Sequence, residues 1–158
     1  MPRKARTFKV RLTPDLQYNS LLVAKFINQV MSDGKKTVAS NIVYSSLTNL
    51  EKTAQEKNVS VLDLFVNIIE SIKPRVKMKS RRVGGATYQV PKPLEPRESE
   101  MIAMKWLIEA ARSASGKTMV QALTTVFSET LEGRGTAVKK KEEMHKSAEA
   151  NKAFAHFA

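Results

Sequence analysis

The chain has 158 residues, no cysteine and a formal net charge of +12, from 27 Lys and Arg against 15 Asp and Glu. Its length suits one ordinary domain, and its hydrophobic content of 42% excludes a wholly disordered chain. The absence of cysteine excludes disulfides and thiolate metal sites, while the excess of cations favours a polyanionic partner such as nucleic acid.

Residues 1–18 show no amphipathic period and are expected to form a basic arm. The first eleven residues contain no acid and five cations, which are Arg3, Lys4, Arg6, Lys9 and Arg11. No apolar run follows them that would indicate a secretory signal. No apolar run elsewhere approaches the length of a membrane span, so a membrane partner is not expected.

Three helices are predicted before the first change of period. The first begins at Asn19 and is broken by Gly34, and the second covers about residues 36–57. The third begins at Ser60, because Ser60 and Asp63 have the spacing of a capping box, and Pro74 ends it.

Residues 73–91 change to a period of two and are predicted to form a β-hairpin. The cations Lys73, Arg75, Lys77 and Lys79 alternate with apolar residues, so on a strand they share one face. Gly84 and Gly85 can adopt positive φ and turn the chain into "ATYQVP". A lone hairpin is marginally stable in water, so its outer half is expected to need a partner.

Three further helices are predicted over about residues 99–112, 118–132 and 137–157. The expected fold class is therefore mainly α, in one domain covering residues 1–158. It consists of a six-helix bundle-like body with a basic β-hairpin inserted between helices three and four, the basic N-terminal arm, and a C-terminal helical segment over residues 136–158.

The candidate phosphate-binding and metal-binding motifs in the sequence lack the spacing that such sites require. In "SASGKT" a phosphate-binding loop would need glycine at position 111, where the chain has Ala111. His145 and His156 are eleven residues apart, and no third nitrogen or sulfur ligand accompanies them. Glu142 and Glu143 lie among lysines on what should be a solvated helix. We expect no enzyme, no metal and no cofactor.

The arm and the hairpin instead favour RNA. Both are cationic segments without acids, and both would pack poorly without an anionic surface. An arginine-rich tip suits RNA, because the flat guanidinium can pair with phosphate or stack on an unpaired base. Lys52 and Lys57, by contrast, are expected to be ordinary solvated lysines.

Four segments resemble one known family. "KSRRVGGATYQVP" is similar to the hairpin motif of the bacterial type of the small-subunit ribosomal protein seven family. "VAKFINQVMSDGKK", "AMKWLIEAAR" and "TAVKKKEEMHKSAEANKAFAHF" resemble its first helix with the following turn, its fourth helix and its last helix. The similarity runs in register from about Pro14 to the end, which is more specific than any single motif.

The resemblance implies six helices with an inserted β-ribbon, and a non-enzymatic role in the small ribosomal subunit. The implied partners are the 3′ major domain of small-subunit rRNA, whose head assembly the protein would nucleate, exit-site tRNA and mRNA near the ribbon, and ribosomal proteins nine and eleven. It further implies a place in a bacterial cytoplasmic ribosome, with an organellar ribosome as the less expected alternative.

Carried over to this chain, the resemblance also implies contact residues. Those implied for RNA are Arg3, Lys4, Arg6, Lys9, Arg11, Lys35, Lys36, Lys73, Arg75, Lys77, Lys79, Arg81, Arg82, Lys117, Met119, Lys139, Lys140 and Lys141. Those implied to lie near tRNA or a neighbouring protein are Arg81, Arg82, Val83, Gly84, Gly85, Asn151, Phe154 and His156. The chain departs from the family at "EPRES", where a basic-rich lead-in to the fourth helix is usual.

Two alternative functions remain open from the sequence. One is a free-standing RNA or DNA chaperone, which would be indifferent to the sequence and structure of its nucleic acid. The other is an additional role as a translational repressor that binds its own mRNA through the same residues.

Overall fold

A computed structural model describes residues 12–157. Its elements in chain order are α1 (Leu21–Val30), α2 (Lys36–Thr48), α3 (Glu51–Glu56), α4 (Val61–Ile72), β1 (Val76–Val83), β2 (Ala86–Pro93), α5 (Pro96–Arg112), α6 (Met119–Leu131), α7 (Thr136–Ala150) and the 3₁₀ helix η1 (Lys152–Phe157). The expected mainly α fold with an inserted hairpin is confirmed. No helix in the described part of the chain is long and apolar enough to cross a membrane.

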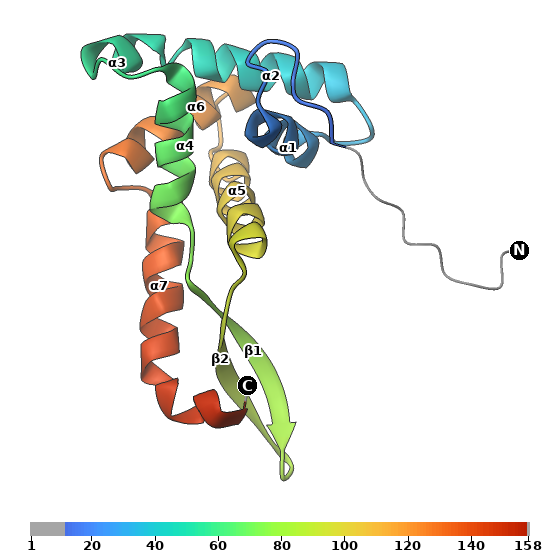
Figure 1. The fold of residues 1–158 in the computed structure, drawn as a ribbon, viewed down its shortest axis with the longest axis vertical. Helices are drawn as coiled ribbons and strands as arrows, with labels where there is room; N and C mark the ends of the chain where they lie inside the picture. Colours follow the sequence, from blue (N-terminus) through green and yellow to red (C-terminus); the bar gives the residue numbers. More distant parts are fainter. Residues whose placement is uncertain (1–11, 158) are drawn as a thin grey trace, which may run out of the picture.

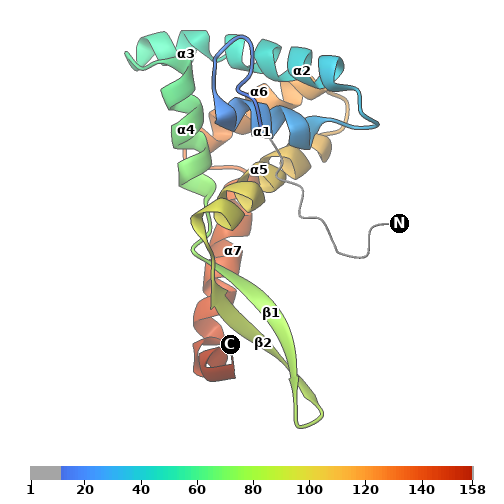
Figure 2. The same ribbon diagram turned by 45° about the vertical axis from the view of Figure 1, so that its right-hand side comes forward.

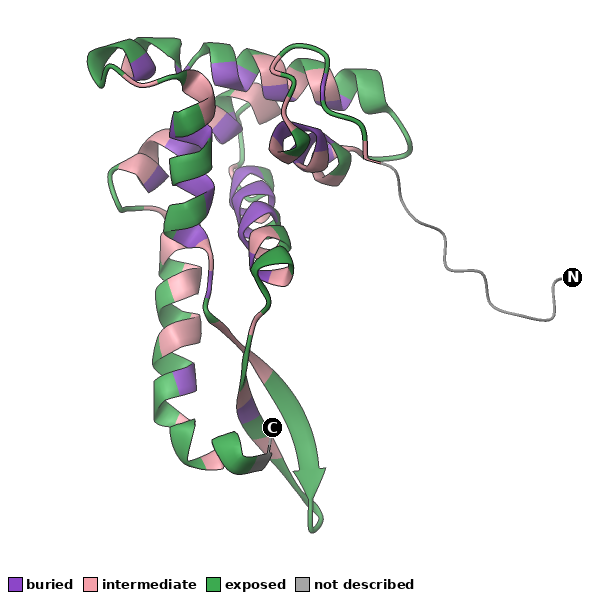
Figure 3. Cartoon of the chain, viewed as in Figure 1, coloured by how far each residue is buried: buried purple, intermediate pink, exposed green. Residues whose placement is uncertain are grey.

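The helices form a body from which α7 and the hairpin extend side by side, and η1 turns back toward β2 (Figures 1 and 2). Buried residues concentrate in α1, α4, α5 and α6, whereas most of the hairpin is exposed (Figure 3). The hairpin and α7 therefore depend on the body for their placement and add little core of their own.

Three phenylalanines join three helices at the centre of the core. The ring of Phe65 on α4 meets that of Phe26 on α1 at 5.3 Å and that of Phe127 on α6 at 5.8 Å, both nearly edge to face. Phe26 and Phe127 meet at 5.9 Å. All three side chains are fully buried. Aromatic pairs in this geometry add to the stabilisation that burial of their area provides.

Local capping sets where several helices begin. The side chain of Ser60 accepts a hydrogen bond from the backbone N–H of Asp63, which confirms the predicted cap of α4. Ser20 caps α1, which begins two residues later than expected because Asn19 adopts a left-handed φ of +48°. Thr118 caps α6. Each hydroxyl satisfies a donor that the helix itself leaves unpaired.

Two expected helices are divided by tertiary packing. The helix predicted over about residues 36–57 ends at Thr48, and a tight turn at Asn49 precedes α3. Polar residues with weak helix propensity surround this break, and the turn leaves Leu47 and Leu50 fully buried. The last helix ends at Ala150, and η1 then brings the ring of Phe154 to 5.0 Å from that of Tyr88.

The hairpin has the predicted turn. Gly84 and Gly85 connect Val83 to its partner Ala86, with φ of +56° and +91°. Positive φ at both central residues matches the turn type whose twist suits a two-residue hairpin loop. The second strand continues beyond Pro91, where the prediction ended it, to Pro93. Proline is tolerated here because each strand of a two-stranded sheet is an edge.

The segment before α1 is a fixed turn within the region expected to be an arm. The carboxylate of Asp15 is buried and accepts backbone N–H bonds from Gln17, Tyr18 and Ser20 at 2.8–3.1 Å. The ring of Tyr18 lies 6.0 Å from that of Tyr44 on α2. The five cations predicted for the arm belong to residues 1–11, outside the described residues.

Candidate nucleic-acid interface

The outer half of the hairpin presents cations that no acid in the described part of the chain neutralises. Lys79, Arg81 and Arg82 are exposed, and none has an ion pair among residues 12–157. The tip residues Val83 and Gly84 are exposed as well, as is Gly85. Such a tip keeps its cations hydrated and available, and an RNA phosphate could take the place of their water at little cost.

The strand register distributes these cations over two faces. Arg81 pairs with Tyr88 and Lys79 with Val90, so these four lie on one face. Arg82 follows Arg81 and therefore lies on the other face, with its partner Thr87. The expected alternation is confirmed from Val76 to Lys79, but the two arginines at the tip point to opposite sides. They could thus contact two different strands or loops of RNA.

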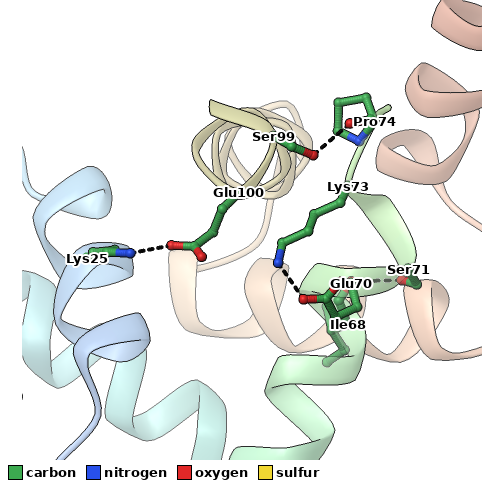
Figure 4. A network of polar contacts seen from close by, with 8 residues as sticks. All are labelled: Lys25, Ile68, Glu70, Ser71, Lys73, Pro74, Ser99 and Glu100. Carbon is green, nitrogen blue, oxygen red and sulfur yellow. Dashed lines mark hydrogen bonds and ion pairs between the residues drawn. The ribbon is translucent and has the colours of Figure 1, made fainter. Parts of the chain in front are cut away.

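The neck of the hairpin, which is residues 73–77 with the facing residues 92–94, is by contrast held by contacts within the protein. Lys73 forms an ion pair with Glu70, and Ser99 Oγ donates a 2.6 Å hydrogen bond to the carbonyl oxygen of Pro74 (Figure 4). Lys77 Nζ lies 2.5 Å from Glu98 Oε2. Of the two acids in "EPRES", Glu98 is therefore used in a contact inside the chain. Figure 4 also shows Glu100 bound to Lys25 of α1 at 2.6 Å.

A second group of predicted residues meets on the body. Lys35 and Met119 line one hollow, between the turn after α1 and the start of α6. Lys36 and Lys117 are exposed beside these elements. Within residues 12–157 the one ion pair of Lys35 is a 4.0 Å contact with the exposed Asp33, which is a weak pair. Met119 packs partly against the core, so only part of its side chain is exposed.

Arg112 lies in this group as well, although it was not among the predicted contact residues. Its guanidinium donates to the carbonyl oxygen of Val30 at 3.3 Å and to Ser32 Oγ at 3.4 Å, and it lines the same hollow as Lys35. The side chain thus joins the end of α5 to the turn after α1. The position of Arg112 in the last turn of a predicted helix was an available signal, because a cation is favoured there. Its partner Val30, however, lies 82 residues away in the sequence.

The three lysines at the start of α7 differ in how free they are. Lys139 is exposed without an ion pair in the described part of the chain. Lys140 Nζ lies 2.8 Å from Glu109 of α5, and this hydrogen bond is the main reason that the pKa of Glu109 is lowered. Lys141 donates a 2.6 Å hydrogen bond to the carbonyl oxygen of Ser71. Only Lys139 is therefore fully available.

The contact residues predicted at the C-terminus lie where the chain bends from α7 toward the hairpin. Asn151 caps α7, and its Nδ2 donates to the carbonyl oxygen of Ser147 at 2.8 Å. Phe154 contacts Tyr88 of β2, and His156 Nδ1 lies 2.8 Å from the carbonyl oxygen of Ala153. The segment from Asn151 to His156 thus lies beside the hairpin.

His145 makes a second contact between α7 and the hairpin. The backbone N–H of Arg75 donates to its Nε2 at 3.1 Å, which requires an unprotonated nitrogen. Burial lowers the pKa of His145 below its usual 6.5, and the charges of Lys141 and Arg75 lower it further. The groove around the imidazole also contains Glu149 and Lys152.

We expect the contact at His145 to weaken in acid. A pKa that is lower in the folded state means that the unfolded chain binds more protons, so the contribution is complete above 6.5 and is lost as the pH falls through the folded-state pKa. Urea unfolding between about pH 7.5 and pH 5 should show a smaller acid-induced loss of stability in H145Q than in the unmodified chain. Equal losses in both proteins would contradict this role.

The sequence is similar to known proteins over almost its whole length. It matches the family described as Ribosomal protein S7p/S5e over residues 2–152. "Small ribosomal subunit protein uS7" of Dichelobacter nodosus is 46% identical over 157 residues, which is 99% of both chains. The proteins of that name from Halorhodospira halophila and Polynucleobacter necessarius are 46% and 47% identical over the same share.

Proposed function

Because the chain belongs to the ribosomal protein S7p/S5e family, we propose that it is a structural, non-enzymatic component of the small ribosomal subunit that binds rRNA. The observation that carries this proposal is the similarity along both the body and the hairpin, 46% over 99% of the chain. The unneutralised cations of the hairpin tip and the lysines at the starts of α2 and α6 support it, because RNA binding draws on accessible cations.

The finer proposal assigns different partners to the two groups of cations. The body, with Lys35, Lys36 and Lys117, holds the 3′ major domain of the rRNA and nucleates assembly of the head. The hairpin tip, together with the segment from Asn151 to His156, reaches exit-site tRNA, the mRNA exit path and ribosomal protein eleven, with ribosomal protein nine as a further neighbour. The ribosome is proposed to be of the bacterial type, in the cytoplasm.

The test of this function is a comparison of two RNAs at two salt concentrations. A transcript of the 3′ major domain and a scrambled RNA of equal length are titrated with the full chain. A preference for the transcript that persists at the higher salt is expected, since nonspecific phosphate attraction weakens steeply with counterion concentration. Equal binding that disappears in salt would instead identify a generic RNA chaperone.

Replacement of Arg81 and Arg82 should distinguish binding of the protein to rRNA from its contact with exit-site tRNA. R81A/R82A is expected to bind the 3′ domain transcript with unchanged affinity, since the tip extends beyond the body (Figure 1). Reconstituted subunits containing it should hold exit-site tRNA less well. K52A/K57A, which removes the same charge from exposed positions at α3, is the control. Loss of transcript binding in R81A/R82A alone would contradict the division of roles.

A further inference from the structure

The first turn of α5 contacts the hairpin at its neck. Glu98 pairs with Lys77 of β1, and the neighbouring Ser99 binds the carbonyl oxygen of Pro74 just before that strand. The backbone N–H of Leu94 also donates to the carbonyl oxygen of Arg75 at 3.1 Å. The position of Glu98 relative to the hairpin is therefore set by hydrogen bonds on both sides of it.

Glu98 pairs with Lys77 and is also attracted by the charge of Lys92. Lys77 pairs with Lys92 across the two strands, so their side chains project from the same face. The pKa of Glu98 is lowered chiefly by the hydrogen bond from Lys77 and by its charge, and to a smaller extent by the charge of Lys92. Two like charges at opposed positions repel each other. The carboxylate thus relieves a repulsion that the register creates.

This arrangement resembles the one that an RNA phosphate would make with the same lysines. A phosphate between Lys77 and Lys92 would be an anion held by two ammonium groups, whereas the Glu98 carboxylate pairs with Lys77 and is attracted by the charge of Lys92. The side chain of Glu98 is 47% exposed and that of Lys77 32% exposed. An ion pair this open to water is weak and can exchange its anion. The unpaired tip cations beyond it, Lys79 among them, have no such competitor in the described residues.

We propose that Glu98 weakens RNA binding at the neck of the hairpin, because its carboxylate occupies Lys77, opposite Lys92, until an RNA phosphate replaces it. The inference rests on the proposed function and deepens it. The neck contributes to rRNA binding only when the RNA reaches the start of α5 and displaces the carboxylate. Glu98 thereby lowers the affinity for RNA at the neck.

The test compares E98Q with E95Q on the 3′ major domain transcript. Glu95 is exposed three residues earlier and forms no ion pair in residues 12–157, so both variants change the net charge equally. E98Q is expected to bind roughly fivefold more tightly near 0.15 M salt and to steepen the salt dependence of log K by up to ~0.9, the effect of one added phosphate contact. E95Q should change affinity by less than about twofold, because no lysine is released.

A second background shows whether Glu98 acts through these lysines. In K77M/K92M, which keeps the long side chains but not their charges, adding E98Q is expected to leave affinity unchanged. An equal gain from E98Q and E95Q, or a gain from E98Q that persists in K77M/K92M, would overturn the inference. The proposed function is judged separately, from the preference of the unmodified chain for the transcript over the scrambled RNA.

Discussion

F65A is expected to destabilise the protein by about 3–5 kcal/mol, the largest effect on stability that we expect from a single substitution. Phe65 is fully buried, and its ring touches those of Phe26 and Phe127, so truncation opens a cavity between α1, α4 and α6. A domain of this size has a total stability of about 5–15 kcal/mol, so the variant should be close to unfolding. Urea denaturation followed by helical circular dichroism measures the difference.

The neighbouring residue provides the control. Val66 on the same helix is 40% exposed, and V66A should change the free energy of unfolding by no more than about 0.5 kcal/mol. A loss of less than about 1 kcal/mol in F65A would mean that the three rings do not form the centre of the core. Near-equal losses in F65A and V66A would lead to the same conclusion.

K35A/K36A/K117A is expected to cause the largest loss of RNA affinity among the variants considered. These three lysines are exposed on the body, and among the described residues Lys117 Nζ has only a 3.5 Å contact with Thr125 Oγ1. If each contacts a phosphate, the salt slope of log K falls by about 0.9 per lysine on duplex RNA, and affinity for the 3′ domain transcript falls by at least about 100-fold near 0.15 M salt. Filter binding at several salt concentrations measures both quantities.

The pattern of loss distinguishes anchoring from a general charge effect. K52A/K57A should retain nearly the full salt slope, because these lysines lie at α3, at the far end of α2 from Lys35 and Lys36. Circular dichroism should show an unchanged fold in all the lysine variants, since none of the replaced side chains is buried. A triple variant that binds the transcript as tightly as K52A/K57A would show that the RNA lies elsewhere on the molecule.

Signals between near neighbours in the sequence were sufficient for the hairpin and for most helix ends. The Gly84–Gly85 pair, after a run of alternating residues, forms the two-residue turn itself. The hydroxyls of Ser60 and Thr118 cap their helices by accepting hydrogen bonds from the backbone N–H groups of Asp63 and Gln121. Pro96 at the first position of α5 was an available signal for an earlier start than the predicted Ser99.

The candidate site was predicted less completely, because charge alone does not show which lysines are neutralised. Lys139, Lys140 and Lys141 are indistinguishable as a run of three, yet Lys140 meets Glu109 from 31 residues away and Lys141 meets Ser71 from 70 residues away. Arg112 was missed for the same reason. These partners become neighbours only after the helices pack.

The fold class, the inserted hairpin and the cationic character of the surface could be predicted from the sequence, since helix periodicity, strand alternation, caps and glycine turns depend on residues close along the chain. Packing sets where the long helices divide and turns Phe154 of η1 onto Tyr88. It also pairs Glu98 with Lys77, while Arg81 and Arg82 have no ion pair within residues 12–157. Burial and ion pairing depend on separation in space, and residues far apart in the sequence become neighbours only when the helices pack.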